Sequence, residues 1–154
     1  MRRAGPVHDR GETLIELLVA IIIMGTAVVA IVGGLGTAIV MSDIHSKQAA
    51  IAAHLNAFAT TIEGAVASSP GYIECATVTS YPSYDPGPQY HAKIEPPVRY
   101  WDATTSTFTT SCTFGNDPGV QLLTLHVWSD DGRVDRSMDI IIRKQCRPTD
   151  TLCT

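Results

Sequence analysis

The chain has 154 residues, of which 45% are hydrophobic and 17% charged, and its net charge is −4 at pH 7. This length suits one modest domain, and the composition excludes a chain that is disordered throughout. One block, Leu17–Met41, is especially rich in aliphatic residues and contains neither a charged residue nor a proline. The composition therefore argues against a purely cytosolic enzyme.

As a helix, this apolar block is about 37 Å long, and the hydrocarbon core of a bilayer is about 30 Å thick. Arg2, Arg3 and Arg10 precede the block, whereas Lys47 is the only basic residue soon after it. Basic residues flanking a membrane span remain in the cytoplasm. The sequence thus predicts a single-pass protein of the cytoplasmic membrane, with its N-terminus in the cytoplasm and its C-terminal part outside.

A helical pattern continues beyond the apolar block. Apolar residues recur at intervals of three, four or seven, which is the stripe of an amphipathic helix. These residues are Ile44, Ile51, Leu55, Phe58, Ile62 and Val66. Pro70 and Gly71 predict that the helix ends near Ser68. A helix from Glu12 to Ser68 is about 85 Å long, and its second half is expected to pack on an apolar partner.

The remainder of the chain predicts a small sheet. Residues 71–97 are rich in Pro, Ser, Tyr and Gly, which indicates a loop with a short extended piece from Cys75 to Val78. Strands are expected at Val98–Asp102, Thr107–Phe114, Val120–Ser129 and Val134–Lys144. Asp130, Asp131 and Gly132 form a turn signal between the last two strands, and the other links are also short. We therefore expect an antiparallel meander.

The last two expected strands each place apolar residues on one face. These residues are Leu123, Leu125 and Val127 on one strand and Met138, Ile140 and Ile142 on the next. Such faces can bury against the helix stripe. The predicted fold class is α+β, with a long N-terminal helix whose second half packs on a small antiparallel sheet.

The four cysteines all lie in the part expected outside the cytoplasm: Cys75, Cys112, Cys146 and Cys153. An even number in an exported domain indicates two disulfides rather than free thiols. Three pairings are possible, and we favour Cys75 with Cys112 and Cys146 with Cys153, the second closing a short loop. No Cys-x-x-Cys pair occurs, and His91 and His126 lack ligand spacing, so no metal or cofactor is expected.

The sequence also lacks familiar catalytic motifs. No Gly-x-Ser-x-Gly, P-loop or His-Glu-x-x-His pattern occurs, so we expect a protein that is not an enzyme. Asp130 and Asp131 suit a tight turn, with calcium binding as a minor alternative. Because the chain is acidic and lacks a basic stripe, DNA is a possible partner without support from the charge pattern.

The junction from Arg10 to Ile21 resembles the class III signal of type IV pilins and type II secretion pseudopilins, in which a basic leader ends in glycine before a long apolar helix. Gly11 stands at the cleavage position, and the Thr-Leu-Ile-Glu-Leu sequence that begins at Thr13 matches the commonest form. Glu16 is then the fifth residue of the mature chain and Gly25 the fourteenth. Glu12 replaces the usual phenylalanine, which this family N-methylates after cleavage.

This resemblance implies a structural subunit, minor pilin or pseudopilin, rather than an enzyme. A prepilin peptidase would cut between Gly11 and Glu12, and an inner-membrane assembly platform would move the subunit into a surface or periplasmic filament with other pilin or pseudopilin subunits. The expected organisation is a leader at 1–11, a transmembrane and filament-core segment at 12–41, an amphipathic helix at 42–68 and an external domain at 69–154.

Glu16 needs a physical reason, because a carboxylate at the centre of a membrane span costs about 2.5 to 3.5 kcal/mol, and less near its end. One reason is local: Thr13 and Glu16 have the spacing of a capping box, and the helix dipole favours an acid there. The other is that Glu16 neutralises the new α-amine of a neighbouring subunit. The alternative function is a membrane-anchored protein that binds a ligand or DNA outside the cytoplasm and does not polymerise.

Overall fold

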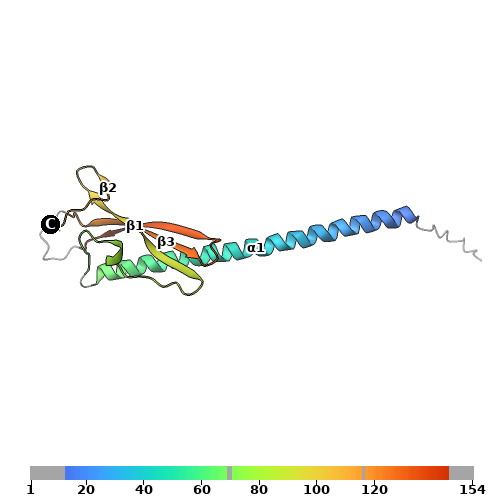
Figure 1. Ribbon diagram of the computed structural model, residues 1–154, viewed down its shortest axis with the longest axis horizontal. Coiled ribbons are helices and arrows are strands. Elements are labelled where there is room, and N and C mark those ends of the chain that lie inside the picture. Colours follow the sequence, from blue (N-terminus) through green and yellow to red (C-terminus); the bar gives the residue numbers. More distant parts are fainter. Residues whose placement is uncertain (1–12, 69–70, 116, 146–154) are drawn as a thin grey trace, which may run out of the picture. The chain divides into compact units, whose positions relative to one another are not determined.

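The structure, a computed structural model, describes residues 13–68, 71–115 and 117–145. Its elements are the helix α1 (Leu14–Ala67), the 3-10 helix η1 (Val78–Ser80) and the strands β1 (Tyr90–Asp102), β2 (Thr107–Thr109), β3 (Val120–Ser129) and β4 (Asp135–Arg143) (Figure 1). The chain divides into two units, Met1–Asp43 and Ile44–Thr154, and α1 contributes to both. The fold is α+β, as predicted.

In the first unit, α1 presents apolar side chains in all directions. Every residue from 13 to 42 is exposed, including Leu14, which is 83% exposed, and Ile39, which is 71% exposed. Among the described residues, α1 is the one helix long and apolar enough to cross a membrane. The glycines at 33, 34 and 36 remain helical, and the Thr37 hydroxyl donates a hydrogen bond to the Gly34 carbonyl at 2.8 Å. The predicted apolar segment is therefore helical throughout its described part.

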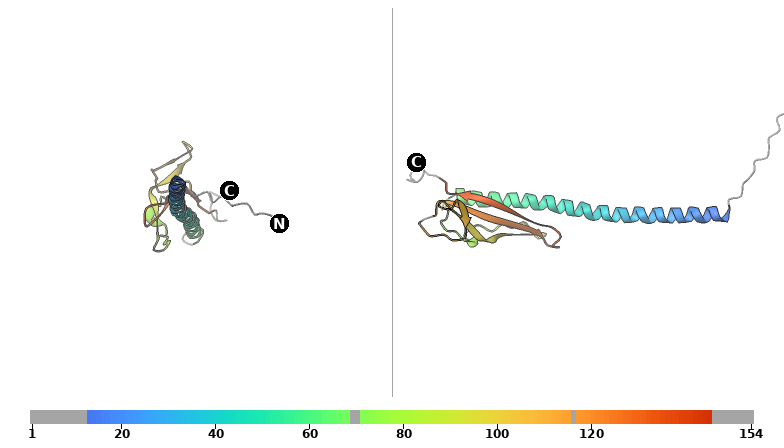
Figure 2. Two further views of the ribbon diagram at one scale, coloured as in Figure 1. Left: turned by 90° about the vertical axis from the view of Figure 1, so that its right-hand side faces the viewer. Right: turned by 90° about the horizontal axis from the view of Figure 1, so that it is seen from above.

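In the second unit, one stripe of α1 is buried. Ile51 and Ile62 are 0% exposed and Phe58 is 1% exposed, at the spacing that the sequence predicts. This part of the helix, green in the figures, lies along one face of the sheet (Figure 2). The helix ends at Ala67, one residue before the predicted end.

The sheet is antiparallel, as expected, but it is not a meander. Its strand order is β2-β1-β3-β4, so β1 lies between β2 and β3. The reason is the length of β1: its last residues, Tyr100–Asp102, pair with β2, while Tyr90–Tyr100 pair with β3 on the other edge. The link of residues 110–119 can reach about 33 Å, enough to pass the end of β1.

Three expected strands have different bounds, of which β4 is one residue shorter at each end than the expected Val134–Lys144. β1 begins at Tyr90 rather than Val98, and it takes up Pro96 and Pro97 where its register with β3 shifts. Proline lacks the N–H that a regular ladder needs, so an irregular site accommodates the pair. β2 ends at Thr109 rather than Phe114, before the disulfide-bonded Cys112. The piece expected to be extended from Cys75 to Val78 is also different: Cys75 has a φ of 49° and η1 starts at Val78.

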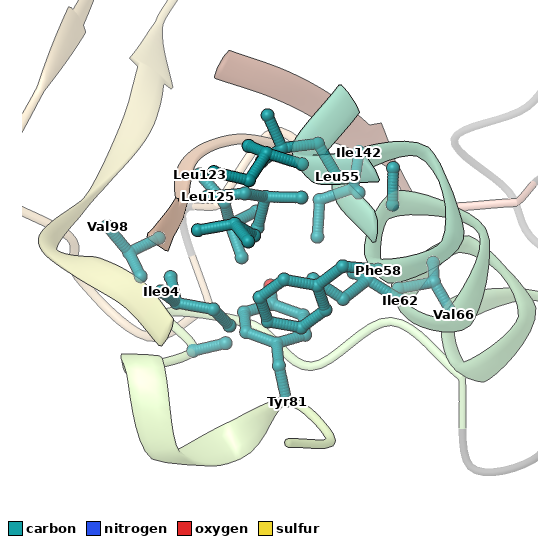
Figure 3. Close-up of a cluster of buried hydrophobic side chains, with 14 of the residues drawn as sticks. Leu55, Phe58, Ile62, Val66, Tyr81, Ile94, Val98, Leu123, Leu125 and Ile142 are labelled. Atoms are coloured by element: carbon teal, nitrogen blue, oxygen red, sulfur yellow. The ribbon is translucent and has the colours of Figure 1, made fainter. Parts of the chain in front are cut away.

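The core lies between the α1 stripe and the inner face of the sheet. Leu123, Leu125 and Val127 of β3 are all 0% exposed. Phe58 and Ile62 of α1 lie close to Leu123, Leu125 and Ile94 in the cluster of Figure 3. On β4, Ile142 is buried, while the other two predicted residues, Met138 and Ile140, are partly buried against the same cluster. The alternation on both strands is thus correctly predicted.

The β3–β4 hairpin turns where the sequence predicts. The N–H of Ser129 donates to the Val134 carbonyl at 2.9 Å, and the N–H of Gly132 donates to the Ser129 carbonyl at 2.9 Å. Gly132 has a φ of 66°, a conformation that costs glycine little. The Asp-Asp-Gly signal therefore acts as a turn.

Candidate functional site

The start of α1 is the first part of the candidate site. The Thr13 carbonyl accepts hydrogen bonds from the N–H groups of Glu16 at 2.9 Å and Leu17 at 3.3 Å, so the helix begins immediately after Thr13. Glu16 lies in the first turn, where the helix dipole favours a negative charge. It is exposed, and its apolar neighbours Leu14 and Ile15 are 83% and 69% exposed. A carboxylate therefore opens an exposed apolar helix.

Of the three other predicted residues of this segment, one lies within the part of the chain that the structure describes. Gly11 and Glu12, at the predicted cleavage point, lie outside the described residues. Gly25 lies within α1, and a Cβ placed there would meet no atom within 4 Å. No close approach within the described chain therefore requires glycine at this position.

One of the two favoured disulfides is present. Cys75 and Cys112 are joined with a Cα–Cα distance of 5.5 Å across a sequence separation of 37. Cys146 and Cys153 lie outside the described residues. Cys75 and Cys112 also lie with Asp117 in a group whose potential ligand atoms are within 4.8 Å of one another. Because the two sulfur atoms are bonded to each other, they are not the thiolates that metals bind.

A partly buried polar cluster surrounds Asp117, and no sequence pattern predicts it. The Asp117 carboxylate accepts hydrogen bonds from the Tyr72 hydroxyl at 2.9 Å, the Cys75 N–H at 3.0 Å, the Gly119 N–H at 2.8 Å and the Gln121 amide at 2.9 Å. Burial alone would raise the pKa of Asp117, but these donors hold the pKa below its usual value. Asp117 therefore holds the β2–β3 link to the segment that follows α1.

Gln121 extends this cluster into the core. It is 0% exposed, its amide donates to the Ile73 carbonyl at 2.9 Å, and its oxygen accepts a hydrogen bond from the Tyr81 hydroxyl. The Tyr100 hydroxyl donates to the Ala76 carbonyl at 2.8 Å. Burial raises the pKa values of Tyr72, Tyr81 and Tyr100 above the usual tyrosine value. These hydroxyls thus remain protonated and donate hydrogen bonds, and the cluster stabilises the fold.

An ion pair joins α1 to the tip of the β3–β4 hairpin. Lys47 Nζ lies 2.5 Å from Asp131 Oδ2, while Asp131 Oδ1 accepts a hydrogen bond from the Ser129 hydroxyl at 2.7 Å. The Lys47 ammonium, then the Ser129 hydroxyl and the Arg133 N–H, hold the pKa of Asp131 well below its usual value. The Asp131 carboxylate is therefore engaged by the turn and by α1, which favours the turn over the calcium alternative.

The outer face of the sheet carries a group of rings. His91 and His126 both lie near Trp128, with ring centroids 5.3 and 5.0 Å from that of the indole. His126 Nδ1 lies 3.1 Å from Glu95 Oε1, and His91 Nε2 lies 3.1 Å from Asp130 Oδ1. The two histidines thus face different carboxylates across a tryptophan rather than a common point.

No protein-family model matches the chain, and no curated protein or solved structure matches it. The order of its elements, a long apolar helix followed by a small antiparallel sheet, is consistent with the pilin-like arrangement that the sequence resemblance implies.

Proposed function

We propose that the chain is a pilin-like structural subunit, a minor pilin or a pseudopilin. A prepilin peptidase cuts it between Gly11 and Glu12, and it then enters a type IV pilus or a type II secretion-like filament with other such subunits. The observation that carries this proposal is the division of α1: its first part is apolar and exposed on every side, and its second part buries a single stripe against the sheet.

This division fits a helix that has two environments in succession. A helix that is apolar all round is stable in lipid or among other helices, and not in water. The second part of α1 already has its partner, because Phe58 and Ile62 pack on the sheet. In the proposed pathway, the first part lies in the cytoplasmic membrane before assembly and among the helices of neighbouring subunits afterwards.

Glu16 gives the proposal its specific chemistry. An anchor requires only apolar side chains, and a carboxylate near the end of a span adds a cost. A subunit cut after Gly11 carries a new α-amine on Glu12. In the dry interior of a filament, Glu16 of one subunit neutralises the amine of its neighbour. Before assembly the same carboxylate suits the positive end of the helix dipole.

We further propose that the protein has no catalytic role of its own. The groups with displaced pKa values that lie together, Asp117, Tyr72 and Tyr81, are hydrogen-bonded partners of the fold. Asp117 binds backbone N–H groups of Cys75 and Gly119, which fixes two loops. These contacts account for the displaced values without a reaction.

Intact-mass analysis of the protein from its native host tests the processing step. The apolar segment follows the basic residues directly, so a cut after Gly11 leaves that segment attached. We expect a chain that begins at Glu12, and one methyl group heavier if the new N-terminus is methylated. A chain that begins beyond Met41 would contradict the proposal, and an uncut chain would favour the anchored, non-polymerising alternative.

A further inference from the structure

A cavity of about 650 Å³ lies where β1 begins and β3 ends. Its walls come from the loop of residues 83–88, from the first residues of β1 and from Trp128 of β3. Three aromatic side chains, Tyr84, Tyr90 and Trp128, line it together with Pro86 and Pro88. This volume is within the range of cavities that bind small molecules.

Contacts behind the walls hold the aromatic rings in place. The Tyr84 ring stacks on Phe58 with centroids 5.3 Å apart, and its hydroxyl lies 3.0 Å from His54 Nδ1. The Tyr90 ring lies 4.9 Å from the His54 ring. Because α1 supports both tyrosines, the cavity has a rigid wall that needs little reordering on binding.

Trp128, on the opposite side, is supported by its neighbours on the sheet. The centroids of the His91 and His126 rings lie 5.3 and 5.0 Å from that of its ring, and Lys93 Nζ lies 5.6 Å from the same centroid. The Lys93 ammonium is also 2.9 Å from Glu95 Oε1. These neighbours therefore hold the indole ring in place. The positive charge of Lys93 is balanced by the carboxylate of Glu95 beside it.

Polar side chains also line the cavity. The Asp85 carboxylate accepts a hydrogen bond from the Gly87 N–H at 2.8 Å and has further acceptor capacity. The Ser83 side chain lines the same space, and His91 Nε2 faces Asp130 at 3.1 Å. A hydrocarbon ligand would remove water from these groups without replacing its hydrogen bonds. An anionic ligand would meet the carboxylate of Asp85, which lines the cavity.

A ligand that contacts both the aromatic and the polar side chains of this cavity favourably has an apolar face and several neutral hydroxyls. We propose that this cavity binds a neutral saccharide, one of whose rings packs its C–H face on Trp128 or Tyr84 while its hydroxyls bond to Asp85, Ser83 and His91. Aromatic side chains provide a large apolar surface with a defined orientation, which suits such a ring. This binding role is separate from cleavage and assembly and does not depend on them.

Isothermal titration calorimetry on the full chain tests the proposal, in a zwitterionic detergent without a sugar headgroup. The probes are glucose, galactose, mannose, their N-acetylated amino sugars and the corresponding neutral disaccharides. We expect saturable binding of at least one probe with a dissociation constant on the order of 1 mM. The absence of saturable heat for all of them up to about 20 mM would overturn the proposal.

Matched tryptophan variants locate the binding site. Trp128→Ala should weaken binding about tenfold, whereas Trp101→Ala, at the far end of β1 against Phe108, should leave it unchanged. An equal effect of both substitutions, or none from Trp128→Ala, would overturn the assignment. Asp85→Ala, in an exposed loop, provides a second variant that keeps the sheet intact and should also weaken binding. Thermal unfolding of each variant verifies its fold.

Fluorescence gives an independent readout. The chain has two tryptophans, so Trp101→Phe leaves Trp128 as the sole indole. The saccharide that binds in calorimetry should change the emission of this variant with the same midpoint. Single-stranded DNA and a sulfated oligosaccharide serve as anionic controls, and binding restricted to these anions would contradict a neutral ligand.

Discussion

The Tyr72 hydroxyl donates to both carboxylate oxygens of Asp117, at 2.9 Å each. Tyr72 belongs to the segment that follows α1, and Asp117 to the link between β2 and β3. The disulfide between Cys75 and Cys112 joins the same two segments. A covalent bond and a charged hydrogen-bond cluster therefore stabilise one junction, and each can be removed separately.

Replacing Asp117 should destabilise the external unit. Asp117→Ala removes an acceptor shared by Tyr72, Cys75, Gly119 and Gln121. Hydrogen bonds to a charged group contribute about 1.5 to 3 kcal/mol each, and losses within one cluster overlap. We expect a loss of about 2 to 4 kcal/mol in the free energy of unfolding, measured by denaturant titration. Asp135→Ala, whose side chain is 75% exposed, is the control and should change it by less than about 0.5 kcal/mol.

The same carboxylate predicts how stability depends on pH. The pKa of Asp117 is below its usual value in the folded protein because of its hydrogen-bond donors, although burial opposes them. Its contribution is complete above the unfolded pKa of about 3.9 and is lost as the pH falls through the lower folded pKa. The melting temperature of the wild type should therefore fall below about pH 4, and that of Asp117→Asn should fall less. Equal acid sensitivity of the two proteins would show that Asp117 is not responsible.

Loss of the disulfide should also destabilise this unit. The bond closes a loop with a sequence separation of 37, for which the chain-entropy model gives about 4 kcal/mol. The variant with both Cys75→Ser and Cys112→Ser should melt at a clearly lower temperature than the wild type under non-reducing conditions. Peptide mapping without reductant should recover the linked Cys75 and Cys112 peptides from the wild type. Two alkylatable thiols at these positions in exported protein would contradict the structure.

The elements governed by local periodicity could be predicted from the sequence. The spacing of Ile51, Leu55 and Phe58 places them on one helix face, and this face is buried. The alternation of Leu123 and Leu125 similarly places them in the core. In both cases a repeat of apolar residues is enough, because burial of the apolar face is the main contribution to packing.

The sheet order and the Asp117 cluster could not be predicted in this way. The first half of β1 is polar on its outer face and contains Pro96 and Pro97, so local preference indicates a loop there. Because β1 is long, β2 pairs with one of its edges and β3 with the other. This order differs from that of a meander. Asp117 is a single acid in a loop, and its partner Tyr72 is 45 residues away. Such long-range contacts leave no periodic signal.

Incorporation of Glu16→Leu into filaments tests the central claim most directly. A lost partner of a buried charge pair costs about 3 to 5 kcal/mol, whereas an anchor loses only the helix-dipole interaction of about 0.3 to 1 kcal/mol and gains from the removal of a carboxylate from its span. Glu63→Leu, the same change at an exposed position later in α1, is the matched control, and Glu12→Phe restores the residue usual in pilins. All three variants should be inserted and cut after Gly11. In an immunoblot of the sheared surface fraction, the account predicts that Glu63→Leu and Glu12→Phe are present and that Glu16→Leu is absent; Glu16→Leu at the wild-type level in that fraction would contradict it.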